Sequence, residues 1–282
     1  MWQVFRHAVV RYRGAVLGFG LALFALGWPI VSAFEVVQRE QEKIAELARN
    51  FEMFITAAGG DVNNLGSPEN FLSMRYFSVL PLILGIYAVL AGSGLLAADE
   101  ENGTLDLVLA HPVSRTALFL GRLAAFAAAT VAILGLSWLG FVVAMSWSSL
   151  DVSGWAMARP FVSLLAVLFF FGGLALLLSM TLPSRRLAAM SAGMVLLASF
   201  FLTTLARMDP GLETVASLSP LAYYQSGDAI DSLNVRWFAG LLIMAGLFAA
   251  LAWWLFERRD IRVVGEGGWR WRLFSRKAPA KT

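Results

Sequence analysis

Long apolar runs without a charged residue recur along the chain and alternate with polar segments. Each run has at least 20 residues. An α-helix of that length rises about 30 Å, which is enough to cross the hydrocarbon core of a bilayer. The pattern therefore predicts an all-α integral membrane protein whose six transmembrane helices cover residues 15–34, 76–98, 123–147, 160–182, 187–206 and 237–256.

The polar segments between these runs predict helices outside the hydrocarbon. Residues 1–14 carry Trp2, Phe5 and Tyr12 on one helical stripe, so we expect an N-terminal interfacial helix. Residues 35–58 carry a similar stripe among charged side chains and predict an outer amphipathic helix. This helix either captures substrate as a cap, lies on the membrane interface, or packs on a second copy of the chain.

The remaining connections are shorter or richer in turn residues. Pro183 to Arg186 forms only a tight turn, which predicts that the fourth and fifth spans are an antiparallel hairpin. Residues 207–236 contain several turn residues and aromatics, and predict short helices at the outer interface. We expect one transmembrane domain over residues 1–262. The basic tail, 263–282, is either an anchor for anionic lipid or a solvated segment.

The distribution of basic residues predicts the orientation of the chain. With the N-terminus inside, the inner segments hold 15 Lys and Arg residues and the outer segments hold 7. Because Lys and Arg are enriched in cytoplasmic loops, we expect a multi-pass protein of the cell inner (plasma) membrane with both termini in the cytoplasm. The net charge of +3 thus reflects membrane topology, and we expect no nucleic-acid partner.

Between the second and third runs lies a distinctive stretch, Ala98 to Arg115, here called the elbow segment. Gly103 tolerates positive φ and lets the chain change direction. Leu105, Val108 and Leu109 then share one side of a short predicted helix. Exposed apolar clusters usually mark a contact surface. We therefore interpret the elbow segment as a docking element that projects from the membrane into water.

The elbow segment contains the string EENGTLDLVLAHPVSR. This string resembles the signature of ABC exporter permeases of the type-2 class: an acid, then Gly-Thr-Leu-acid, an apolar turn, and Pro-x-Ser-Arg. In that family the segment is a coupling helix that fits a groove on a separate ATP-hydrolysing subunit. The resemblance therefore assigns ATPase coupling to Glu101, Gly103, Thr104, Leu105, Asp106, Val108, Leu109, Pro112, Ser114 and Arg115.

The resemblance also implies partners and a cargo path. Two permease copies, identical or different, would assemble with two ABC ATPase subunits that hold the ATP and Mg. Residues 1–14 would be the family's connecting helix, with a plain membrane anchor as the alternative. Cargo would pass between the two copies, and an uncharged path favours a lipid-like cargo. The second and fifth spans would line this path with Tyr87, Ser93, Phe200, Phe201, Thr203 and Thr204.

Composition excludes several other functions. The chain has no Cys and two His residues, so we expect neither thiol chemistry nor a metal site. No charged residue lies inside the six runs, which argues against a carrier driven by protons or sodium. The acids from Asp99 to Glu101 suit a role in docking beside a helix dipole better than catalysis. We therefore expect no catalytic residue on this chain.

These observations predict a permease subunit that couples ATP hydrolysis by a separate chain to movement of a substrate across the membrane. The chain lacks G-x-x-x-x-G-K-[ST], so it has no P-loop for nucleotide phosphates. Two alternatives come from other classes. A membrane scaffold or assembly anchor would use the elbow segment for binding without ATP, and a membrane enzyme would be active as the purified chain.

Overall fold

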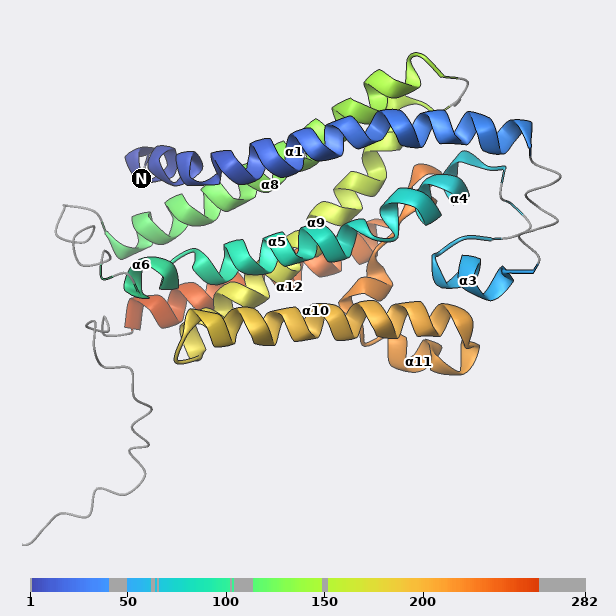
Figure 1. Cartoon of the computed structure of the whole chain (residues 1–282). Coiled ribbons are helices and arrows are strands. Elements are labelled where there is room, and N and C mark those ends of the chain that lie inside the picture. The colour runs from blue at the N-terminus through green and yellow to red at the C-terminus, as the bar shows by residue number, and fades with distance from the viewer. Residues whose placement is uncertain are drawn as a thin grey trace, which may run out of the picture.

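The computed structural model describes residues 2–40, 50–61, 64, 66–101, 103, 114–148 and 152–258. Over these residues the chain is helical and contains no strand, as the sequence predicts. Five of the helices are long and apolar enough to cross a membrane (Figure 1). They are α1 (Trp2–Arg39), α8 (Arg115–Met145), α9 (Gly154–Thr181), α10 (Arg185–Met208) and α12 (Val235–Arg258), and each covers one predicted span to within two residues.

The predicted second span, 76–98, is broken. It starts at the end of a π-helical turn η2 (Ser73–Phe77), which continues α4 (Pro68–Leu72), and then runs through α5 (Leu80–Gly94) into the short α6 (Ala97–Glu101). The segment before the break at residues 78 and 79 is bent by 42° from α5. Six spans result if this bent pair crosses as one.

Pro81 explains part of the break. A proline has no backbone N–H, so the carbonyl four residues earlier, that of Phe77, receives no helical hydrogen bond. The hydroxyl of Tyr224, far along the chain, donates to the Phe77 oxygen at 3.2 Å instead. A hydrophobicity pattern does not reveal this partner, so the sequence predicts one continuous helix for the second span.

The N-terminal segment also differs from the prediction. Residues 2–14 do not form a separate interfacial helix, because α1 continues without interruption from Trp2 to Arg39. No proline or other strong helix breaker stands between the polar start and the apolar run. At 1.5 Å per residue α1 is about 57 Å long, well beyond the thickness of the hydrocarbon.

The outer connections agree in part with the predicted elements. Residues 210–230 form four short helices: η3 (Pro210–Leu212), α11 (Glu213–Ala216), η4 (Pro220–Tyr223) and η5 (Gly227–Ile230). Of the predicted amphipathic helix 35–58, the structure describes the end of α1 and the short α3 (Glu52–Ala57), which packs on α10. Residues 41–49 lie outside the described residues.

The helices pack as two units. α1 and α8 lie side by side along their length, and α9 lies at the centre of the other unit with α5, α10 and α12 around it (Figure 1). α9 and α10 are joined through residues 182–184 as the predicted antiparallel hairpin. Within the first unit, an added Cβ at Gly27 would meet the carbonyl carbon of Gly140 at 2.8 Å. The backbones of α1 and α8 are therefore in direct contact.

Candidate functional site

The site is built at the end of the bundle where α6 ends and α8 begins, here called the elbow end. The N-terminal end of α1, all of α6, the first turns of α8 and α10, and the last turn of α12 meet there (Figure 1). Among the predicted coupling residues, the structure describes Glu101, Gly103, Ser114 and Arg115. The other six lie outside the described residues: Thr104, Leu105, Asp106, Val108, Leu109 and Pro112.

Gly103 has the conformation that the sequence suggested. Its φ angle is +65°, in the left-handed region that a residue with a Cβ adopts at a cost. Gly103 lies two residues after Glu101, the last residue of α6. This conformation at Gly103 is the one that the sequence predicts for a change of chain direction within the elbow segment.

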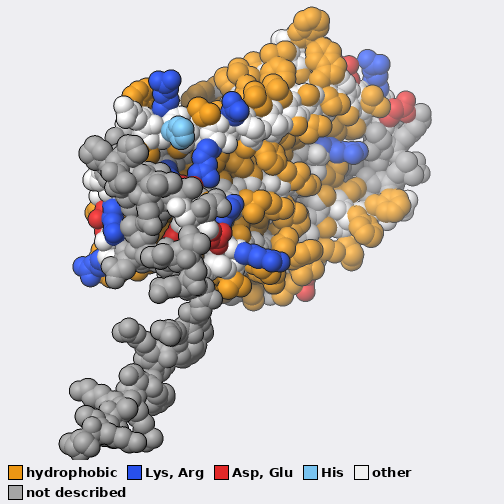
Figure 2. Space-filling view, turned by 60° about the vertical axis from the view of Figure 1, so that its left-hand side comes forward, with side chains coloured by type: hydrophobic (Ala, Val, Ile, Leu, Met, Phe, Trp, Pro, Cys, Tyr) orange, Lys and Arg blue, Asp and Glu red, His pale blue; other side chains and the backbone are white. Residues whose placement is uncertain are grey.

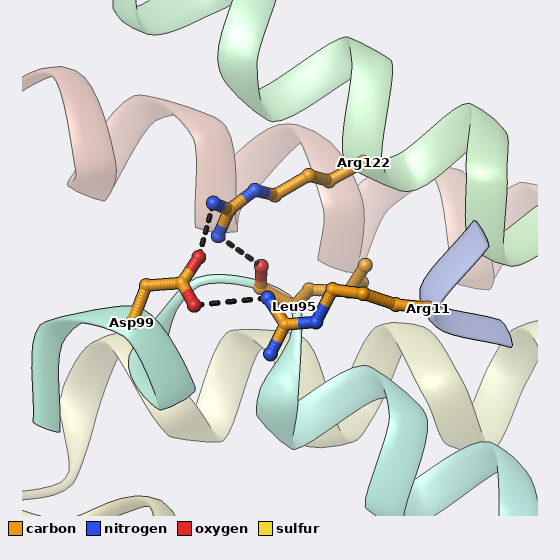
Figure 3. A network of polar contacts seen from close by, with 4 residues as sticks. All are labelled: Arg11, Leu95, Asp99 and Arg122. Carbon is orange, nitrogen blue, oxygen red and sulfur yellow. Dashed lines mark hydrogen bonds and ion pairs between the residues drawn. The ribbon is translucent and has the colours of Figure 1, made fainter. Parts of the chain in front are cut away.

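Asp99 is the central residue of a buried ion network (Figure 3). One carboxylate oxygen accepts a hydrogen bond from Arg11 Nη1 of α1 at 2.9 Å, and the other forms an ion pair with Arg122 of α8. Arg122 also donates to the backbone oxygen of Leu95 at 2.7 Å, in the turn between α5 and α6. One carboxylate thus connects α6 to two transmembrane helices.

Burial makes this network costly to disturb. The side chains of Asp99 and Arg122 are each 10% exposed, whereas that of Arg11 is 53% exposed. Removing one partner of a buried ion pair leaves an uncompensated charge in a medium of low dielectric, which costs about 3–5 kcal/mol. An exposed pair contributes less, because water solvates both groups after separation.

Glu101 connects the elbow segment to a third transmembrane helix. Its Oε1 accepts a hydrogen bond from the backbone N–H of Arg185 at 2.9 Å, at the first residue of α10. A carboxylate is stabilised at this position by the free N–H groups and the positive end of the helix dipole. Ser184 caps the same helix end by accepting from the N–H of Leu187.

The far end of the elbow segment is attached as well. Ser114 is the N-cap of α8 and accepts a hydrogen bond from the N–H of Ala117 at 3.2 Å, as its position before the apolar run predicts. The hydroxyl of Thr116 donates to Glu257 Oε1 at 2.7 Å, and Arg115 Nη1 donates to the Glu257 backbone oxygen at 3.5 Å. These contacts join the start of α8 to the last turn of α12.

Side chains outside the network give the elbow end a basic surface. Arg side chains gather there, while hydrophobic side chains cover much of the surface between the two ends of the molecule (Figure 2). Arg6, Arg13, Arg186 and Arg258 are exposed in this region. A broad apolar band with charges at its ends is the distribution that a bilayer requires. Within the described part of the chain, no group of His, Asp and Glu could hold a metal ion.

The predicted cargo-path residues lie in two different environments. Tyr87 is buried between the rings of Phe19 and Phe126, and Ser93 is fully buried and bonded to the Leu90 oxygen. Phe201 is 61% exposed on α10. The other three are partly buried on the same helix, where Phe200 packs on the core, Thr203 bonds to the Ser199 oxygen, and Thr204 lies one residue beyond.

Sequence reasoning missed the roles of Arg11, Asp99 and Arg122. Asp99 was interpreted as part of an exposed docking cluster, but its carboxylate points inward and is paired. A signal was present, since Asp99 directly follows one apolar run and Arg122 directly precedes the next. Opposite charges at the same membrane depth on successive spans are well placed to pair.

Together, the bundle and its apolar surface define a multi-pass membrane protein. Comparison with family models identifies which one: the model described as ABC-2 family transporter protein matches residues 2–261. The chain therefore belongs to the ABC-2 transporter family, as a transmembrane permease. A search of curated proteins finds no match.

Proposed function

We propose that the chain is the membrane subunit of an ATP-driven exporter and that a separate ABC ATPase docks on the elbow segment. The observation that carries this proposal is the attachment of the segment at both ends. Asp99 and Glu101 connect its beginning to α1, α8 and α10, and Arg115, together with the adjacent Thr116, connects its end to α12. A force applied to the elbow segment would thus reach four transmembrane helices.

In this mechanism the permease performs no bond chemistry. ATP and Mg bind to the partner ATPase, whose nucleotide-dependent closure shifts the elbow segment as a lever. The attached helices then rock between inward-facing and outward-facing states, which is the rigid-body class of conformational change. The membrane would be the cell inner membrane, with the elbow end and both termini in the cytoplasm.

We further propose that two permease copies assemble along α5 and α10. These helices contact each other, and both present apolar side chains outward, including Ile86 and Leu90 on α5 and Met194 and Phe201 on α10. Cargo would pass between the copies beside Phe201 and Thr204. An apolar lining of this kind suits a lipid-like or amphipathic cargo.

Co-purification tests the ATPase assignment. The tagged chain is expressed in its native host and solubilised gently, and the proteins that accompany it are identified. We expect an ABC ATPase with the wild type and its loss with Leu105→Asp or Leu109→Asp. Leu218→Asp is the matched control, because Leu218 is 82% exposed in the outer connection and should not affect binding.

Two outcomes would contradict the proposal. If no ATPase accompanies the wild type, or if it binds regardless of the elbow substitutions, the elbow segment is not the coupling element. Binding of another cytoplasmic protein without dependence on nucleotide would favour a membrane scaffold.

A further inference from the structure

We propose that Asp99 is a positioning residue that holds the two packed units of the bundle together at the elbow end through its ion pairs with Arg11 and Arg122, here called the clasp. Through these ion pairs it transmits movement of the elbow segment to the α1–α8 unit. This inference rests on the proposed function for the transmission, although the clasp itself is independent of any ATPase. It assigns to one carboxylate a role that its place in the sequence does not reveal.

The first step is that α1 and α8 behave as one unit. Their backbones meet at Gly27 and Gly140 near one end. Near the elbow end, a Cβ at Gly121 would lie 2.9 Å from a side-chain carbon of Val4 and 3.4 Å from the backbone nitrogen of Phe5. Close packing over this length leaves little freedom for α1 and α8 to move separately.

The second step is that this unit has few contacts with α5 and α6. α5 packs mainly on α9 and α10, and its contact with α8 is slight by comparison. At the elbow end, Asp99 supplies charged contacts between α6 and both helices of the unit. The network is therefore the charged connection between α6 and both helices of the α1–α8 unit in the described structure, and the contacts of Arg115 and Thr116 with Glu257 join the same unit to α12.

The third step is that the two ion pairs differ in strength. Arg122 is buried, pairs with Asp99 and donates to the Leu95 oxygen. Separating Arg122 from α6 would therefore leave a buried charge without a partner or water. Arg11 is half exposed and can exchange Asp99 for water at little cost. The Arg122 pair is thus the permanent part of the clasp, and the Arg11 pair is the part that opens when the units shift.

The test uses the absence of cysteine in the natural chain. Spin labels are attached to His7→Cys on α1 and Arg186→Cys on α10, both exposed positions of the elbow end. Labelled chains are diluted with unlabelled chains in lipid nanodiscs, so that distances within one copy dominate. The distance distribution is measured by electron paramagnetic resonance, first for the permease alone and then with the ATPase and Mg-ATP plus vanadate.

For the permease alone, we expect a single narrow distance in the wild type, a longer or broader distribution in Asp99→Asn, and a smaller broadening in Arg11→Gln, which loses only the exposed ion pair. Asp99→Glu keeps the charge and should restore most of the wild-type distribution. Arg13→Gln is the matched control, since it removes the same charge from the same helix at an exposed site. Arg11→Gln keeps the test decisive if Asp99→Asn does not fold, because the buried pair stays intact.

With the ATPase, Mg-ATP and vanadate should shift the distance in the wild type and in Arg13→Gln. In Asp99→Asn the shift should fall at least threefold while the ATPase stays bound. Wild-type distributions in both Asp99→Asn and Arg11→Gln would overturn the clasp. The two parts of the inference can also fail separately. If the wild-type permease binds no ATPase, but the substitutions still lengthen or broaden the distance distribution, the clasp stands and the transmission fails together with the proposed function.

Discussion

The hydroxyl of Tyr224 replaces a hydrogen bond that Pro81 removes from the backbone. It lies 3.2 Å from the oxygen of Phe77, four residues before the proline. Both Tyr224 and Phe77 are buried, so water does not satisfy this carbonyl. The break in the second span is therefore stabilised by a residue from the connection between α10 and α12.

Tyr224→Phe should lower the free energy of unfolding by about 1–3 kcal/mol, because it leaves a buried carbonyl without a donor. Thermal unfolding in detergent, followed by tryptophan fluorescence, measures the change. Tyr223→Phe is the matched control, since the Tyr223 hydroxyl donates to the Ser217 oxygen at an exposed site. Equal effects of the two substitutions would show that the Phe77 carbonyl does not depend on Tyr224.

The same residue predicts a dependence of stability on pH. Burial raises the pKa of Tyr224 well above its usual value. The folded protein therefore holds this proton more tightly than the unfolded chain, in which tyrosine titrates near about pH 10. Below that pH the contribution is constant, and above it the free energy of unfolding should fall as pH rises. Tyr224→Phe should make this fall shallower in unfolding scans between about pH 8 and pH 11.

Gly140→Ala should destabilise the α1–α8 unit. Its new Cβ would lie 2.6 Å from the Cα of Phe24, and backbone atoms cannot move aside as a flexible side chain can. Overpacking of this kind costs about 1–3 kcal/mol. Gly240→Ala on α12, where nothing lies within 4 Å of the added atom, should be neutral or slightly stabilising in the same thermal assay. The contact between α1 and α8 would be disproved if Gly140→Ala were also neutral.

Arg122→Gln should be strongly destabilising, by about 3–5 kcal/mol, because it leaves the buried Asp99 carboxylate without its main partner. The yield of monodisperse protein and its unfolding temperature measure the loss. Arg186→Gln removes an equal charge from an exposed position of the elbow end and should have little effect. A mild effect of Arg122→Gln, similar to that of Arg186→Gln, would mean that water reaches the network.

The sequence predicts the long helices well because their signal is local. Each apolar run matches one helix or broken helix to within two residues, and Ser114 caps α8 as its position before the third run predicts. Small residues four positions apart do not by themselves indicate a close helix contact. Gly14 and Gly18 have open space around them, whereas Ala88 and Gly92 meet α9 at Gly172.

The rest depends on contacts between distant residues. Asp99 and Arg11 are 88 positions apart, and neither residue type indicates a buried ion pair by itself. The inward turn of Asp99 follows from the break between α5 and α6, which hydrophobicity does not show. Of the described part of the elbow segment, the sequence therefore predicted the positive φ of Gly103 and the Ser114 cap, but not the charged network around Asp99.

The broken second span also constrains how the protein is made. α5 has 15 residues and rises about 22 Å, which is shorter than the hydrocarbon is thick. Its continuation through η2 depends on Tyr224 and on the hydroxyl pair of Ser73 with Ser226, residues synthesised about 150 positions later. The second span to leave the ribosome is thus completed only when the last third of the chain arrives, so a protein truncated before Tyr224 should insert this span incompletely.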